Sequence, residues 1–305
     1  GNWTSPPPGL TPATLTFSGA TQTSSVNNNA VTSVANIVFP NPTAGFSSGF
    51  TLSGENVTAG ALNVSSTSAD SAVITDTIDF NVQLTGNARF NNGSARNLIV
   101  NGLITQDGNN RNVLKAGQGG TLILTNTANS FNGQMQINVG VVSVPQIGTV
   151  GQPSPMGTGN PVRIGNGANT GTIIYTGSGE TANRYLQVGG GALPTATGGA
   201  TITANGSAAL VFRSEGRVSA EGFAVGNFNN PQSNATAASR PLTLSGTSTA
   251  DNQIASVIAN NTATSLVGVT KAGSGRWILS GANTYTGGTQ VNAGTLVLNG
   301  STGVG

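Results

Sequence analysis

Short apolar runs broken by glycine, asparagine or serine recur along the whole chain, and this punctuation limits the possible folds more than any other feature. Runs such as NIVF, SAVIT, FNVQL, TIIYT and TLVLNG alternate apolar and small polar residues, a pattern typical of half-buried strands. No window of ten residues shows the i, i+3, i+4, i+7 apolar stripe of an amphipathic helix. The sequence therefore predicts an all-β protein.

The composition narrows the possible partners. Charged residues make up 7% of the 305 residues, whereas about 25% is usual for a soluble domain. The eleven lysines and arginines are dispersed and the net charge is +2, so no basic stripe indicates a nucleic-acid partner. No run approaches the roughly 18 apolar residues of a membrane-spanning helix. We therefore expect neither nucleic-acid binding nor membrane insertion by this segment.

One long motif occurs twice. Residues 115–144, KAGQGGTLILTNTANSFNGQMQINVGVVSV, correspond to residues 271–300, KAGSGRWILSGANTYTGGTQVNAGTLVLNG, with two one-residue insertions. The matched pairs include Lys115 with Lys271, Gly117 with Gly273, Leu122 with Trp277, Leu124 with Leu279, Asn129 with Asn283, Phe131 with Tyr285, Gly133 with Gly287 and Gly140 with Gly294. The repeat divides the chain into two units, 1–145 and 146–305, each ending in the motif. We expect them to form one continuous rod.

The spacing inside the motif predicts strands joined by tight corners. Glycine accepts positive φ without steric cost, so Gly287, Gly288 and Gly294 are placed where the chain turns. In TLVLNG, alternation directs Leu296 and Leu298 inward. Strand and corner in alternation are typical of a β-solenoid, with roughly 20–25 residues per coil and about a dozen coils in a chain of this length.

The motif resembles the autotransporter-associated β-strand repeat, which occurs in the passenger regions of bacterial type V secreted proteins and in large bacterial surface proteins. The family pattern is close to K-x-G-x-G-x-L-x-L-S-G-x-N-x-Y-x-G-G-T-x-V-x-A-G-T-L-x-L. Residues 271–298 follow it with Trp277 in place of one leucine, and residues 115–144 follow it less closely. The resemblance implies a right-handed parallel β-helix that is exported and works outside the cell. The family has no common catalytic residues to transfer.

The residues available for chemistry are few. Without histidine and cysteine, a Ser-His-Asp triad, a Cys-His pair and a zinc site of these ligands are excluded. Of the nine acids, Asp76 and Asp79 are the closest pair, but three residues apart in a strand they point to opposite faces. We interpret both as solvated turn residues. We expect no catalytic, cofactor-binding or metal-binding residues and no cofactor.

Three other groups of residues have a simple structural interpretation. Arg213, Glu215 and Arg217 alternate and are expected to form a surface row of ion pairs, while residues 107–110, DGNN, are expected to form a polar turn and not a calcium loop. The aromatic side chains are expected to fill the core or its corners and not to form a sugar-stacking platform; they are Trp3, Trp277, Tyr175, Tyr185 and Tyr285.

These expectations favour a non-enzymatic extracellular structural protein that builds a cell-surface stalk, layer or filament. Its partner would be itself, by end-to-end or lateral association, or the continuation of a longer repeat protein. The alternative is an adhesin or autotransporter passenger that binds surface glycans or proteins through the irregular segments 145–161, 189–199 and 226–241. A carbohydrate-active β-helix enzyme is a minor alternative. The expected location is the bacterial cell surface.

Overall fold

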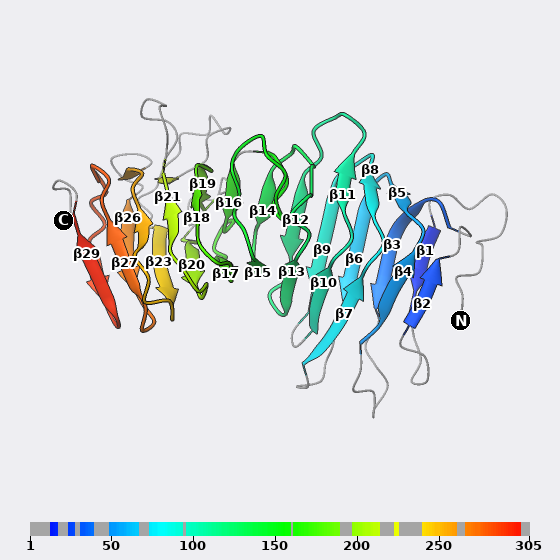
Figure 1. Ribbon diagram of the computed structural model, residues 1–305, viewed down its shortest axis with the longest axis horizontal. Helices are drawn as coiled ribbons and strands as arrows, with labels where there is room; N and C mark the ends of the chain where they lie inside the picture. Colours follow the sequence, from blue (N-terminus) through cyan, green and yellow to red (C-terminus); the bar gives the residue numbers. More distant parts are fainter. Residues whose placement is uncertain are drawn as a thin grey trace.

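A computed structural model shows that the chain is a stack of parallel strands. It describes residues 13–17, 24–27, 31–39, 49–66, 73–93, 96–159, 161–189, 197–213, 223–225, 240–260 and 266–299. These residues contain strands, turns and no helix, and every pair of neighbouring strands is parallel. The strands lie side by side along the long axis, with β1 (Ala13–Thr16) near one end of the rod and β29 (Thr295–Leu298) at the other (Figure 1). The fold is the right-handed parallel β-helix expected from the sequence.

Each coil of the helix has three sides, and the first two sides are long continuous sheets. The first sheet contains β1 (Ala13–Thr16), β3 (Val34–Phe39), β6 (Leu62–Ser66), β9 (Ala88–Asn92), β12 (Val113–Ala116), β14 (Met135–Ile137), β16 (Val162–Ile164), β19 (Leu186–Val188), β22 (Phe223–Val225) and β25 (Ile258–Ala259). The second sheet contains β2 (Ser24–Asn27), β4 (Thr51–Gly54), β7 (Ile74–Ile78), β10 (Arg96–Val100), β13 (Thr121–Leu124), β15 (Gly140–Val144), β17 (Gly171–Tyr175), β20 (Ala200–Ala204), β23 (Arg240–Gly246), β26 (Val267–Lys271) and β28 (Thr289–Val291).

The third side is interrupted. One short sheet contains β5 (Val57–Ala59), β8 (Val82–Leu84) and β11 (Ile104–Gln106). A second one contains β18 (Glu180–Ala182), β21 (Leu210–Phe212), β24 (Asn252–Ile254), β27 (Arg276–Leu279) and β29 (Thr295–Leu298). Between them the third side has no strand, but backbone hydrogen bonds such as Ser130 N to Ile104 O and Ser154 N to Asn129 O continue the stacking.

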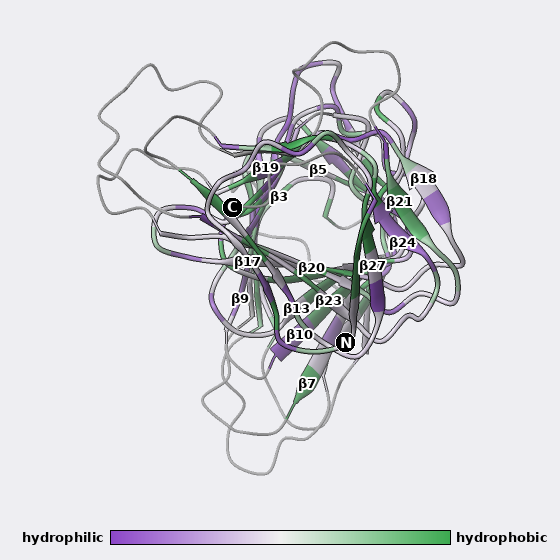
Figure 2. Cartoon of the chain, turned by 90° about the vertical axis from the view of Figure 1, so that its left-hand side faces the viewer, coloured by the Kyte–Doolittle hydropathy of each residue, from purple (hydrophilic) through white to green (hydrophobic). Residues whose placement is uncertain are grey.

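The core fills the inside of the helix with columns of apolar side chains. Figure 2 looks along the rod and shows the three sides enclosing this interior. Alternate residues of each strand point inward, and the parallel register places them above one another. One column of the second sheet consists of Leu98, Leu122, Val142, Ile173, Ile202 and Leu244, all fully buried. The rod therefore owes its regularity to the period-two pattern of its strands.

The last described coil shows where the pattern alone is insufficient. Leu296 and Leu298 are in register with the buried side chains of Trp277 and Leu279, as the alternation predicts. Leu296 is nevertheless only partly buried and Leu298 is 48% exposed. In the described part of the chain no further coil stacks on β29, so these inward positions have a neighbour on one side only.

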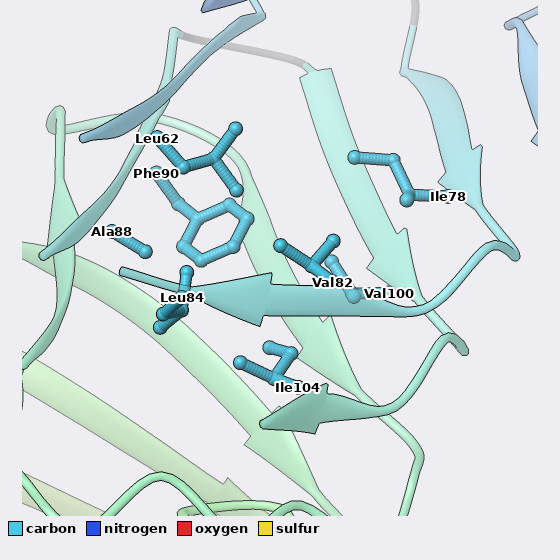
Figure 3. Close-up of a pocket in the computed structure, with 8 residues that line it drawn as sticks. All are labelled: Leu62, Ile78, Val82, Leu84, Ala88, Phe90, Val100 and Ile104. Atoms are coloured by element: carbon cyan, nitrogen blue, oxygen red, sulfur yellow. The ribbon is translucent and has the colours of Figure 1, made fainter. Parts of the chain in front are cut away.

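The first two sheets run without a break across residue 145, from β14 to β16 and from β15 to β17. The division into units 1–145 and 146–305 stays a prediction from the repeat. A small apolar void of about 10 Å³, close to the volume that holds one water centre, lies inside the N-terminal coils. Its lining side chains converge in Figure 3; they are Leu62, Ile78, Val82, Leu84, Ala88, Phe90, Val100 and Ile104.

Candidate functional site

The repeated motif is organised around a buried lysine. Lys115 and Lys271 are the only lysines of the chain, and both side chains are fully buried. Lys115 Nζ donates to the carbonyl oxygens of Ala116 at 3.0 Å, Gly117 at 2.8 Å and Gly119 at 3.4 Å. These carbonyls belong to the corner that follows β12. At the corner these backbone carbonyl groups point away from the hydrogen bonds of the sheets. The ammonium group therefore satisfies them as hydrogen-bond acceptors.

Lys271 does the same at the second copy. Its Nζ donates to Ala272 O at 2.6 Å, to Gly273 O at 2.8 Å and to Ala293 O at 3.1 Å. Ala293 lies in the corner of the next coil, so this lysine links two stacked corners. The sequence comparison matched the two lysines without assigning them a role. Their burial could have been suspected, because both lysines of the chain precede an Ala-Gly-x-Gly corner.

The stacked corner on each lysine requires glycine. Gly140 and Gly294 have φ of 81° and 70°, in the left-handed region that favours glycine. A Cβ on Gly140 would lie 2.7 Å from Gly117 O and 2.9 Å from Lys115 Nζ. A Cβ on Gly294 would lie 2.5 Å from Gly273 O and 2.7 Å from Lys271 Nζ. Lysine and glycine in the motif thus form one packed unit.

The asparagine and aromatic positions of the motif also have matching roles. Asn129 Oδ1 accepts a hydrogen bond from Ile104 N at 2.8 Å, and Asn283 Oδ1 accepts one from Ile258 N at 3.0 Å. Each bond reaches back 25 residues to the preceding coil. The aromatic side chains two residues after these asparagines, Phe131 and Tyr285, are both fully buried. Each copy therefore fastens itself to the coil before it by a buried amide.

The two copies occupy different sides of the helix. In the first copy the lysine lies on β12 of the first sheet and the next strand, β13, belongs to the second sheet. In the second copy the lysine lies on β26 of the second sheet and the next strand, β27, belongs to the third side. The motif is offset by one side of the coil. The motif therefore determines a corner and the two strands that flank it, but it does not determine which sides of the coil they occupy.

Burial affects the ionisation of both lysines. Loss of hydration lowers the pKa of Lys115 from 10.5 to about 8 and also lowers the pKa of Lys271. At neutral pH the Lys115 side chain is still an ammonium ion that can donate to the corner carbonyls. In the described residues both ammonium groups donate only to carbonyl oxygens of the motif corners, so we assign these lysines to the folding of the rod and not to ligand binding.

Residues 145–159 form a surface loop that is hydrogen-bonded to the following coil. Ile147 N and Gly148 N donate to the carboxylate of Glu180 at 2.5 and 3.0 Å, and Val150 N donates to Asn183 Oδ1 at 2.9 Å. Glu180 and Asn183 belong to the following coil. The loop tip, residues 151–153, is exposed, whereas residues 154–157 are buried. This segment, expected to be irregular, has no strand but is held in one conformation.

Arg184 is the central support of this loop. It is 4% exposed, and its guanidinium donates to Gly159 O at 2.5 Å, to Ser154 Oγ at 3.1 Å and to Gly157 O. Burial lowers the pKa of Arg184 to about 10, and the charge of Glu180 opposes that shift. Burial also raises the pKa of Glu180, while the two backbone N–H groups and Arg184 act in the opposite direction. The loop is therefore held by one buried and one half-buried charged group.

The closest pair of acids in the sequence, Asp76 and Asp79, does not form a catalytic pair. Asp76 and Asp79 point to opposite faces, as expected, but the interpretation of Asp76 as a solvated turn residue was wrong. Asp76 lies in β7, is fully buried and pairs with Arg96 at 2.6 and 2.8 Å, because both belong to the second sheet one coil apart. Asp79 is exposed and accepts a hydrogen bond from Asn101.

The remaining predicted residues are placed as follows. Asp107 pairs with Arg111 at 2.6 Å in an exposed turn, and this arginine holds the pKa of Asp107 well below its usual range. Arg213 is exposed, while Glu215 and Arg217 lie outside the described residues. Trp277, Tyr175, Tyr185 and Tyr285 are buried as expected, and Trp3 lies outside the described residues. So do most of the segments 189–199 and 226–241.

The described residues contain neither a metal-binding cluster nor a membrane-spanning helix. No cluster of three or more aspartate, glutamate, histidine or cysteine side chains is suited to hold a metal ion there. Within the same residues, no helix has the length and apolar character needed to cross a membrane.

Comparisons with known proteins agree with the repeat. A model of the passenger-associated-transport-repeat matches residues 115–144 and 269–298. The chain is also 31% identical over 185 residues, 61% of its length, to the adhesin BmaC autotransporter of Brucella suis biovar 1 (strain 1330). It spans only 5% of that relative. No solved structure matches the chain. The chain therefore contains two copies of the passenger-associated-transport-repeat and is similar over part of its length to an autotransporter adhesin.

Proposed function

We propose that this chain is a non-enzymatic rod segment of a bacterial cell-surface passenger, which presents its surface loops to a glycan or protein target. The observation that supports this most is the loop at residues 145–159, whose exposed tip lies between segments held by buried Arg184 and half-buried Glu180. A loop that is already ordered loses less entropy on binding. The similarity to an autotransporter adhesin supports the adhesive role.

The rod itself supports a display function. Its parallel sheets keep the loops at fixed positions along the axis, and each coil contributes one strand spacing of about 4.8 Å to its length. The carbohydrate-active alternative loses support, because one acid of the closest pair, Asp76, is buried and neutralised by Arg96. A glycosidase needs two carboxyl groups facing each other across a bond.

Surface display tests the proposal. The chain would be displayed on a non-adherent laboratory bacterium, and attachment to epithelial cells, matrix proteins and a glycan array would be measured. We expect cells that display the chain to attach more strongly than cells that do not. The tip variant Gln152→Ala with Pro153→Ala should attach less strongly than the wild type. The matched control is Asn110→Ala in another exposed turn, which should attach like the wild type. If the chain is detected on the cell surface but the cells attach to none of these targets, the adhesive role is contradicted.

A further inference from the structure

The outer face of the second sheet differs from an ordinary protein surface. We define the outer face as the outward side chains of β4, β7, β10, β13, β15, β17, β20, β23 and β26. These strands contain four charged residues, Asp76, Arg96, Arg240 and Lys271, and all four point inward and are buried. The outward positions of these strands contain no charge. The first sheet is different, since Arg89 and Arg163 lie in one of its outward columns.

The outer face carries its large apolar side chains in the middle, between two hydroxyl-rich ends. On the four middle strands the outward side chains are half apolar, Ile99, Ile123, Val141 and Ile174, and half polar, Asn97, Thr121, Ser143 and Thr172. The hydroxyl ends consist of Thr51, Ser53, Thr75 and Thr77 on one side and Thr201, Thr203, Thr243, Ser245 and Thr270 on the other. All these side chains are half-buried. An apolar centre with a polar rim is the usual anatomy of a protein–protein interface.

The size and spacing of the outer face favour one particular partner. Nine strands spaced about 4.8 Å apart and about five residues wide give an area of about 700 Å², close to the roughly 800 Å² per partner of a stable interface. A second copy has the same strand spacing, so its side chains can interdigitate along the whole face, as between packed sheets. Because the face has no charge, two copies meet without like-charge repulsion.

We propose that two copies of this chain pair laterally through their outer faces, antiparallel and related by a two-fold axis near β13 and β15. This arrangement places β13 of one copy over β15 of the other, so that Ile123 and Val141 of both copies lie around the axis, and it places the Thr77 end of one copy over the Thr203 end of the other. A two-fold interface uses the same patch on both partners. The pairing is independent of the proposed adhesive role, since the loop at residues 145–159 lies outside the outer face.

Sedimentation equilibrium tests the pairing. We expect the wild type to be dimeric at micromolar concentration and Ile123→Lys to be monomeric, because it places two ammonium groups at the two-fold axis. The matched control is Leu114→Lys, a half-buried apolar position on the outer side of the first sheet, which should remain dimeric. Unchanged circular dichroism would show that each variant is folded. A monomeric wild type, or a dimeric Ile123→Lys, would overturn the proposal.

Cross-linking tests the orientation. The chain has no cysteine, so single cysteines can be added at Thr77→Cys and Thr203→Cys. With a short bis-maleimide, the mixture of the two variants should give a cross-linked dimer and either variant alone should not. Cross-linking of Thr203→Cys alone would overturn the antiparallel arrangement. A wild type that is monomeric in solution but still attaches when displayed would contradict the pairing and leave the adhesive role intact.

Discussion

The buried lysine of the first repeat makes a prediction that can be worked out from the structure. Lys115→Met keeps an unbranched apolar stem between the in-register residues Phe90 and Ile137 but removes the ammonium group. Two good hydrogen bonds, to Ala116 O and Gly117 O, and one long bond are lost. An unsatisfied buried acceptor costs about 1–3 kcal/mol. Allowing for the relief of a buried charge, we expect the free energy of unfolding to fall by about 2–4 kcal/mol at pH 7.

The same lysine gives the stability a characteristic pH dependence. The pKa of Lys115 is about 8 in the folded protein and 10.5 in the unfolded chain. Between these values the unfolded chain binds more protons, so the free energy of unfolding rises with pH. At about 1.4 kcal/mol per pKa unit, the rise between pH 8 and pH 10 amounts to at most about 3 kcal/mol. Above pH 10 the trend reverses, because burial raises the pKa of Tyr185 to about 12 and the unfolded tyrosine ionises first.

Urea unfolding followed by circular dichroism between pH 7 and pH 10 measures both effects. We expect wild-type stability to increase through this range and Lys115→Met to lose most of the increase. Lys271→Met is the matched comparison, with a smaller effect because only one further described coil stacks on it. Equal stability of Lys115→Met and the wild type at pH 7, together with equal pH profiles, would refute the role given to the lysine.

Four further substitutions follow from the packing. Gly140→Ala should cost more than about 2 kcal/mol, because φ is 81° and the new Cβ would lie 2.7 Å from a carbonyl oxygen; a smaller loss in thermal unfolding would argue against the packed corner. Asp76→Asn should cost about 3–5 kcal/mol by leaving Arg96 buried without its carboxylate, and an unchanged urea midpoint would contradict this. Arg184→Met should speed amide exchange in the loop at residues 145–159 while the sheets stay protected, and unaltered exchange would show that the loop needs no such support. Ala88→Val should fill part of the apolar void and add up to about 1 kcal/mol, whereas Ala200→Val, far from the void, should destabilise.

The sequence was sufficient for the parts of the fold that depend on local pattern. Period-two alternation identified the inward side chains, so Leu122 and Trp277 are buried at equivalent positions of the repeat. Of the motif glycines predicted to lie at corners, Gly288 and Gly294 have positive φ, whereas Gly287 does not. The residues that fill the core are therefore largely those that alternation selects.

The contacts between coils could not be predicted in the same way. The pairing of Asp76 with Arg96 and the support of the loop at residues 145–159 by Arg184 depend on how many residues each corner contains. Corner lengths vary along the chain, so the side of the coil on which a residue falls is known only from the structure. For the same reason the sequence did not reveal that the two repeats are offset by one side.

Amine labelling tests most directly the claim that each repeat is a corner closed by a buried lysine. The chain has two lysines and one terminal amine, so mass spectrometry after acetylation with a water-soluble reagent at pH 7.5 gives a simple count. The account predicts one acetyl group on the native protein, at the terminus, and three in urea. Rapid acetylation of Lys115 or Lys271 in the native protein would contradict it.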